Sequence, residues 1–171
     1  MGGFAGWAGM VTLSAVNVPM TLALTISIVF WSWILGRLLN ELLRKRSDYQ
    51  QLAHWVFLPG NRLNRWIGLG IFKWIVVHTF FRYLNQKLTL PGRPSREALE
   101  AVREEMVYSE ISHLIGFGLV GVAVLVNVLC FEHPALTWSL LVTNVFMNLY
   151  PALLQQQNKR RLIAALSATK A

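Results

Sequence analysis

With 54% hydrophobic and only 14% charged residues over 171 positions, the chain is too apolar for an ordinary soluble domain and fits an integral membrane protein. The formal net charge is +8, and the basic residues flank apolar segments, so we expect contacts with anionic lipid head groups or an anionic substrate and none with nucleic acid. Cys130 is the only cysteine, which excludes an internal disulfide.

The first apolar stretch predicts a transmembrane helix over about residues 15–36. Residues 2–36 contain no charged side chain, and about 20 apolar residues suffice to cross a bilayer core. Trp31 and Trp33 near its end, followed by Arg37, match the pattern of an aromatic belt and a cytoplasmic basic loop. Because the N-terminus lacks the basic region of a signal peptide, we interpret this stretch as a retained span.

The second apolar stretch, residues 66–81, is short for a span and contains Lys73, so we predict re-entrant or interfacial placement. All 16 lysines and arginines lie in residues 37–103 or 159–170. If the short stretch does not cross, every basic residue faces the cytoplasm and the N-terminus lies outside. This is the arrangement that the positive-inside rule favours.

Two further spans are predicted, at about residues 111–131 and 135–154. Ser95 is a suitable N-cap for a helix that continues into the first of them, and a turn at Pro134 separates the two. The sequence therefore predicts an all-α integral membrane protein, a single domain over residues 1–171, with three transmembrane helices plus one re-entrant or interfacial helical segment. We expect it in a bacterial cytoplasmic membrane, with the N-terminus outside and the C-terminus cytoplasmic.

A glutamate and a histidine lie where the chain enters the 111–131 span. Glu110 and His113 are three residues apart, so they share one face of a helix. Ionisable groups at such a depth are costly and usually face a cavity or a partner. An imidazole there can take a proton from a hydroxyl while the carboxylate holds its tautomer or its charge. The alternative is half of a di-metal site, but we find no second E-x-x-H motif and predict no metal.

Five residues of the last span are spaced four, three, four and three apart, namely Asn144, Asn148, Pro151, Gln155 and Asn158. On an α-helix they form one stripe. An amide in hydrocarbon needs a partner, so we expect the stripe to face inward. We interpret Asn144 as packing through interhelical hydrogen bonds, and Asn148 with Gln155, beside Pro151, as part of a site.

Two basic residues have two interpretations each. Lys73 either reaches toward the lipid head groups or holds a phosphate or carboxylate opposite His113. Arg161 either anchors the chain at the membrane surface or binds phosphate. The sequence leaves both alternatives open.

At these positions the chain resembles the small membrane acyltransferases of the glycosyl-4,4'-diaponeurosporenoate type, which acylate a sugar on a carotenoid glycoside. The first matching pattern is Glu105 followed by Ser109-Glu110-Ile111-Ser112-His113. The second is made up of Asn148, Gln155, Asn158, Arg161 and Leu162. A weaker match is Asn64-Arg65-Trp66 followed by Lys73. The resemblance covers roughly residues 60–162.

The resemblance implies transfer of a fatty acyl chain from a thioester donor to a hydroxyl of a glycolipid or other lipid-linked acceptor at the cytoplasmic face. His113 is then the general base and Glu110 its orienter. The residues implied to bind substrate are Glu105, Lys73, Asn148, Gln155, Asn158 and Arg161. The donor is expected to be acyl-CoA or an acyl carrier thioester, with no cofactor. The expected partners are membrane lipids and the lipid-linked acceptor.

Two other functions fit the same residues. A non-catalytic membrane subunit or scaffold would use the amide stripe for packing alone and its basic face to dock a partner. A membrane hydrolase or protease would use Glu105, Glu110 and His113.

Overall fold

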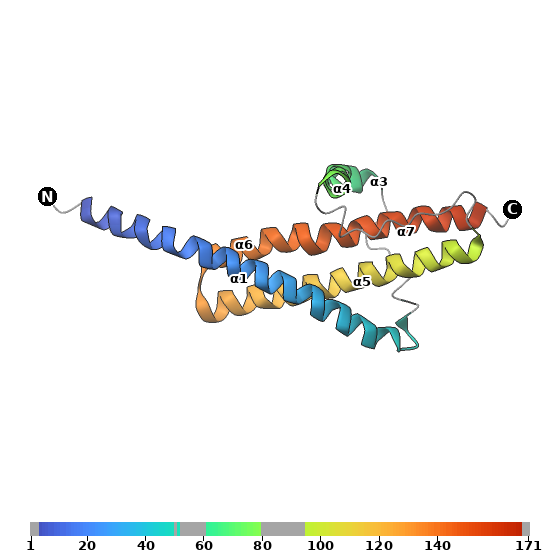
Figure 1. The fold of residues 1–171 in the computed structure, drawn as a ribbon, viewed down its shortest axis with the longest axis horizontal. Helices are drawn as coiled ribbons and strands as arrows, with labels where there is room; N and C mark the ends of the chain where they lie inside the picture. Colours follow the sequence, from blue (N-terminus) through green and yellow to red (C-terminus); the bar gives the residue numbers. More distant parts are fainter. Residues whose placement is uncertain (1–3, 50, 52–60, 80–94, 169–171) are drawn as a thin grey trace.

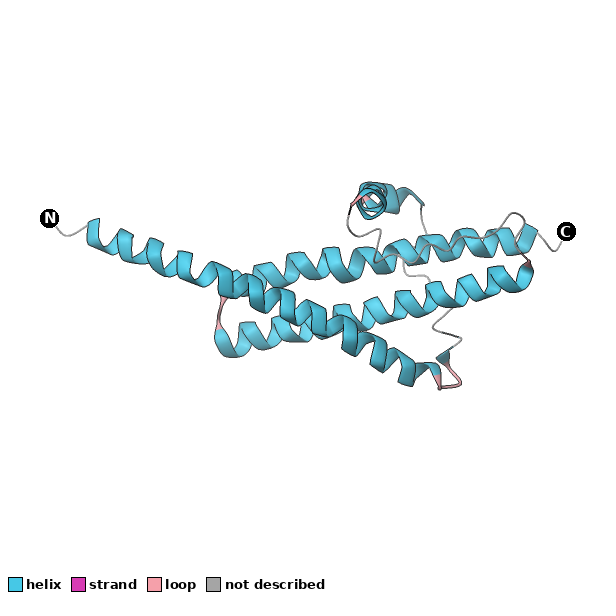
Figure 2. Ribbon diagram, viewed as in Figure 1, coloured by secondary structure: helices cyan, strands magenta, loops and turns pink. Residues whose placement is uncertain are grey.

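The structure, a computed structural model, describes residues 4–49, 51, 61–79 and 95–168. Within these ranges every regular element is a helix (Figure 2). The predicted all-α class is therefore confirmed for the part of the chain that the structure describes.

Three long helical rods make up most of the molecule (Figure 1). They comprise α1 (Phe4–Arg44), then α5 with the π-helix η2 (Arg96–Val126 and Asn127–Phe131), then α6, η3 and α7 (Pro134–Asn144, Val145–Leu149 and Tyr150–Ala168). The second and third rods run side by side in opposite directions, and α1 crosses both. Each rod is longer than the predicted span that it contains.

The ends of the second rod are set by local sequence. The Ser95 side chain caps α5 by accepting a hydrogen bond from a backbone amide of the first turn at 3.2 Å. At the other end, the Asn127 amide donates to the His133 carbonyl at 2.9 Å and to the Thr137 hydroxyl at 2.8 Å. Pro134 begins α6, where a missing backbone N–H costs nothing. The turn between the rods is therefore held by polar contacts.

The backbones of α1 and α5 approach each other closely where they cross. A Cβ atom on Gly36 would lie 2.6 Å from the Ser112 carbonyl oxygen, and one on Gly116 would lie 3.3 Å from that of Ser32. Small residues four apart on facing helices are typical of close crossings in membranes. One turn farther along α1, the Asn40 amide donates to Ser112 Oγ at 2.9 Å. Small and polar side chains together hold the first rod on the second.

Gly36→Ala is expected to lower the free energy of unfolding by about 1–3 kcal/mol. The added methyl group meets a backbone oxygen that cannot turn away, so the helices must separate. Unfolding in SDS, followed by circular dichroism, measures the loss. Gly118→Ala in α5 is the matched control, because no atom lies within 4 Å of its added Cβ. Equal stability of the two variants would contradict the close crossing.

A short helical segment lies across the third rod. It consists of α3 (Asn61–Trp66) and α4 (Leu69–His78), and Figure 1 shows α4 end-on while α7 runs along the horizontal axis. Leu69 is buried against α7. The Tyr150 hydroxyl on α7 donates a hydrogen bond to the Ile67 carbonyl. These contacts hold α4 at a steep angle to the long rods.

The predicted 66–81 segment therefore forms only a short helix. The ten residues of α4 amount to about 15 Å, half the thickness of a bilayer core. Trp66, Ile71 and Trp74 are exposed on this segment. Residues 80 and 81 lie outside the described part of the chain. Length and exposed tryptophans both fit a helix at a membrane surface.

Two helical stretches, Val18–Arg44 and Arg96–Phe131, are long and apolar enough to cross a membrane. Large apolar side chains remain exposed along both, for example Leu129 at 70%. Soluble monomers rarely expose extended apolar surfaces, so this pattern supports a membrane location. The apolar clusters between the helices are small, and the buried members of one of them are Val29, Val120 and Leu140.

Candidate active site

A buried pair of amides sits where α1, α5 and the third rod meet. Asn148 is fully buried, and its Nδ2 donates to Asn144 Oδ1 at 2.9 Å and to Ser32 Oγ at 3.4 Å. Asn144 Nδ2 donates in turn to the Phe117 carbonyl at 3.0 Å. These bonds fix which way the Asn148 amide points. Its other polar atom, Oδ1, is buried, faces α5 and makes no hydrogen bond to another described residue.

Beside this amide lies the ring of His113, half-buried on α5. The two side chains come together because α5 has a glycine here: a Cβ atom on Gly116 would lie 2.8 Å from Asn148 Oδ1. The oxygen of a fixed amide accepts an N–H and so selects one tautomer of an imidazole. His113, Asn148, Asn144 and Ser32 form what we call the polar centre.

Glu110 makes its contacts with α7. Lys159 Nζ lies 2.6 Å from Glu110 Oε2, and Gln156 Nε2 donates to Glu110 Oε1 at 3.0 Å. All three side chains are buried. A buried carboxylate needs a cation and hydrogen bonds, since an isolated buried charge is very unfavourable. Glu110 thus ties α5 to α7, whereas Asn148 is a polar neighbour of His113.

The π-helix η3 shifts the buried face of the third rod by one residue. A π-turn closes an i to i+5 hydrogen bond, so it holds one residue more than an α-turn. Both asparagines of the predicted stripe are buried as expected. Beyond η3, however, the buried polar residues are Gln156 and Lys159, where a continuous α-helix would have placed Gln155 and Asn158. The latter two are half-buried, which corrects the inward stripe predicted from the sequence.

Sequence reasoning alone does not single out Gln156 and Lys159, because both lie within a polar and basic tail. One signal was available: a carboxylate buried at Glu110 requires a cation, and Lys159 is the first one after the last span. The π-turn has no comparable signal. The Trp33 Nε1 donates to the Met147 carbonyl within it at 3.3 Å, a contact that only the three-dimensional arrangement reveals.

None of the contacts just described involves the other predicted site residues. Glu105 is exposed on α5, Lys73 is half-buried on α4, and Arg161 is exposed on α7. Within the described ranges, no three His, Cys, Asp or Glu side chains gather where they could hold a metal ion. The predicted lack of a metal stays a prediction.

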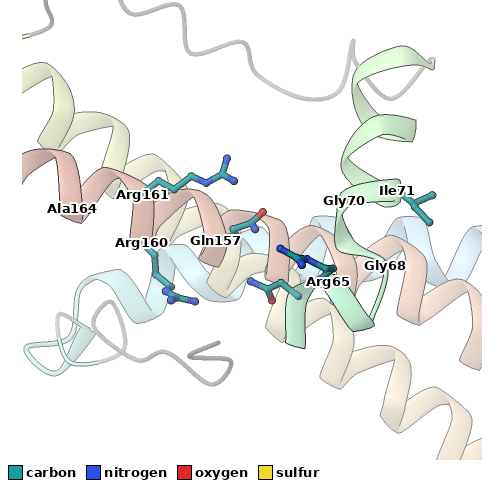
Figure 3. Close-up of a pocket in the computed structure, with 9 residues that line it drawn as sticks. Arg65, Gly68, Gly70, Ile71, Gln157, Arg160, Arg161 and Ala164 are labelled. Atoms are coloured by element: carbon teal, nitrogen blue, oxygen red, sulfur yellow. The ribbon is translucent and has the colours of Figure 1, made fainter. Parts of the chain in front are cut away.

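A half-open cavity of about 850 Å³ lies between the α3–α4 segment and α7 (Figure 3). Arg65 comes from α3, while Gln157, Arg160 and Arg161 come from α7. The described residues that line it are Asn64, Arg65, Gly68, Gly70, Ile71, Gln157, Arg160, Arg161 and Ala164. None of these nine described residues is acidic, so the cavity carries a net positive charge. We call it the arginine groove.

Comparison with known proteins places this arrangement in a family. The family model for glycosyl-4,4'-diaponeurosporenoate acyltransferase, CrtO, matches residues 45–168. That range takes in the short helices, α5 and the third rod, and with them His113, Asn148 and the arginine groove. Neither the curated proteins nor the solved structures give a match. Because the family model covers well over half of the chain, the protein belongs to the glycosyl-4,4'-diaponeurosporenoate acyltransferase family.

Proposed function

We propose that the protein moves a fatty acyl chain from a thioester donor to a hydroxyl of a glycolipid or other lipid-linked acceptor, with His113 as the general base. Membership of an acyltransferase family supports the reaction class. The observation that carries the assignment of the base is the polar centre. There an imidazole lies beside an amide that two further side chains hold in one orientation.

In the proposed reaction, His113 takes the proton of the acceptor hydroxyl as the oxygen attacks the thioester carbonyl. A C–O ester bond forms, the C–S bond breaks, and the leaving thiolate receives the proton from the imidazolium. Asn148 Oδ1, which makes no hydrogen bond to another described residue, is proposed to accept the N–H of one ring nitrogen, which leaves the other nitrogen able to take a proton. Asn148 therefore replaces Glu110 as the group that orients the base.

The remaining polar residues have supporting roles in this proposal. Glu110, paired with Lys159, holds α5 against α7 and so keeps the base on α5 in register with Asn148 on the third rod. Gln155 and Asn158 are half-buried and are proposed, with Glu105, to contact the polar head of the acceptor. Lys73 and Arg161 are proposed to meet anionic groups of the donor.

The proposed arrangement in the membrane has the three rods crossing and α4 lying at the cytoplasmic surface. The steep angle between α4 and α7 supports surface placement, because an element perpendicular to crossing helices lies in the membrane plane (Figure 1). With α4 at the surface, the positive-inside rule puts the N-terminus outside and the C-terminus in the cytoplasm. His113, at the start of the predicted 111–131 span, then lies toward the side of the membrane from which a cytoplasmic donor is reached.

Ester formation by the purified protein tests this function. The protein in neutral detergent is given a labelled acyl thioester and a lipid glycoside, and the products are identified by mass spectrometry. The expected result is a new acylated glycoside that carries the label. Hydrolysis of the thioester to free fatty acid without ester formation would point to the hydrolase, and no turnover of any acceptor would point to the non-catalytic subunit.

A further inference from the structure

The arginine groove is lined by three arginines that come from two different helices. Arg65 from α3 and both Arg160 and Arg161 from α7 line one cavity, although the side chains of Arg160 and Arg161 point away from each other (Figure 3). Like charges held around one space repel each other, so an anion that enters is bound favourably. Planar guanidinium groups match phosphate oxygens in bidentate geometry. The amides of Asn64 and Gln157 add neutral hydrogen-bond donors to the same lining.

The volume of the groove suits a small molecule. About 850 Å³ falls within the range of ligand pockets, roughly 300–1,000 Å³. A protein partner would need a contact surface of about 800 Å² on this chain, much broader than one cavity. The half-open shape also lets part of a longer ligand extend out of the groove. These features favour a phosphorylated small molecule over a carrier protein.

The third rod contributes residues both to the arginine groove and to the polar centre. The two sets of residues are separated by a distance that one extended ligand can span. Arg160 follows Asn148 by twelve residues, which corresponds to about 18 Å along a helix. A ligand with phosphates at one end and a reactive group at the other, joined by an extended arm, would reach both. The pairing of Lys159 with Glu110 fixes the intervening turn of α7 against α5, so the separation is set by the fold.

From these observations, and resting on the proposed acyl transfer, we infer that the arginine groove binds the phosphate groups of an acyl-coenzyme A donor. The nucleotide end of coenzyme A occupies the groove, and its pantetheine arm leads the thioester toward His113. Arg65, Arg160 and Arg161 form the contacts to phosphate. The same chemistry could come from an anionic phospholipid head group, and the experiment below separates the two sources.

The test is calorimetric titration of the purified protein in neutral detergent with coenzyme A. Arg65→Ala and Arg161→Ala remove exposed side chains, so both variants are expected to fold normally. Each loses one charge-assisted contact, and we expect binding about 10-fold weaker for each and about 100-fold weaker for the double variant. Arg46→Ala, which removes an exposed arginine beyond the end of α1, is the matched control and should bind as the wild type does.

Three further titrations complete the test: one with dephospho-coenzyme A, one with phosphatidylglycerol in nanodiscs and one with a holo acyl carrier protein. Dephospho-coenzyme A, which lacks one phosphate, is expected to bind more weakly than coenzyme A. Wild-type affinity for coenzyme A in the double variant would overturn the inference. The inference would also be overturned if the protein did not bind coenzyme A but bound another ligand through the arginines. That ligand could be phosphatidylglycerol in nanodiscs or a holo acyl carrier protein. If Arg65→Ala proves unstable, Arg65→Gln, which keeps much of the side-chain length, replaces it.

The outcomes also separate this inference from the proposed function. Coenzyme A binding that depends on the arginines, without ester formation from acyl-coenzyme A, would leave the groove assigned and reject the acyl transfer. Ester formation with an unchanged KM for acyl-coenzyme A in the double variant would reject the groove assignment and leave the function.

Discussion

Lys159→Met is expected to lower the free energy of unfolding by about 3–5 kcal/mol. The substitution keeps the length of the side chain but leaves the Glu110 carboxylate buried without its cation. The lysine is 1% exposed and the glutamate side chain 4%, so water does not screen the pair and the cost is not discounted as it is for a surface ion pair. SDS-driven unfolding followed by circular dichroism measures the difference.

Two comparisons show whether the stability lost in Lys159→Met comes from the unpaired carboxylate of Glu110. In the double variant Glu110→Gln with Lys159→Met, no charge is buried and the amide of Gln156 keeps an oxygen to bond to. Most of the stability is expected to return, because replacing both members of a buried pair is often neutral. Arg161→Ala removes an exposed cation two residues away and should change stability by no more than about 0.5 kcal/mol. A Lys159→Met variant as stable as Arg161→Ala would contradict the buried pair.

His113→Gln is expected to reduce turnover by about 10²–10⁴-fold, the usual contribution of a general base. Glutamine is close to histidine in size and can still bond to Asn148, but it cannot take the proton of the acceptor hydroxyl. Thermal stability should therefore change little while the initial rate of labelled ester formation falls. Glu100→Gln is the control, since Glu100 is exposed on α5 and forms its ion pair with Arg96 of the same helix.

Asn148→Leu tests the positioning role within the same centre. Leucine fills the space of the amide but gives His113 no oxygen to bond to and leaves Ser32 and Asn144 without their partner. Turnover is expected to fall as well, by less than in His113→Gln, because a mobile imidazole still takes the proton in some of its orientations. Turnover equal to the wild type would remove Asn148 from the proposed mechanism.

Much of the fold follows from the sequence because apolar stretches and their breaks are local signals. The apolar stretch that ends at Gly36, the Ser95 cap and the Pro134 turn predict helices where the structure has α1, α5 and α6. The crossing of α1 over α5 is different, since it depends on Gly36 meeting a backbone oxygen on another helix. The spacing of small residues within one helix does not indicate which residues of another helix they will face.

The burial of the polar residues on the third rod was predictable up to the π-turn and not beyond it. His113 and Asn148 stand out because a histidine and an amide inside apolar sequence need partners. Gln156 lies on the buried face, where regular α-helical spacing predicts Gln155, because η3 adds one residue to a turn. A prediction from helical periodicity assumes the same number of residues in every turn and therefore misses this shift. The arginine groove is lined by Arg65 together with residues near the C-terminus, such as Arg160 and Arg161. A single sequence carries no signal that positions so far apart lie close together.

The pH dependence of single-turnover acyl transfer by the wild type and by His113→Gln tests the general base most directly. The wild-type rate is predicted to rise with pH and then level off, because only the neutral imidazole accepts a proton. The residual rate of His113→Gln should lack this rise. A variant that keeps the wild-type rate, or a slower variant that shows the same rise and plateau, would contradict the assignment of His113 as the base.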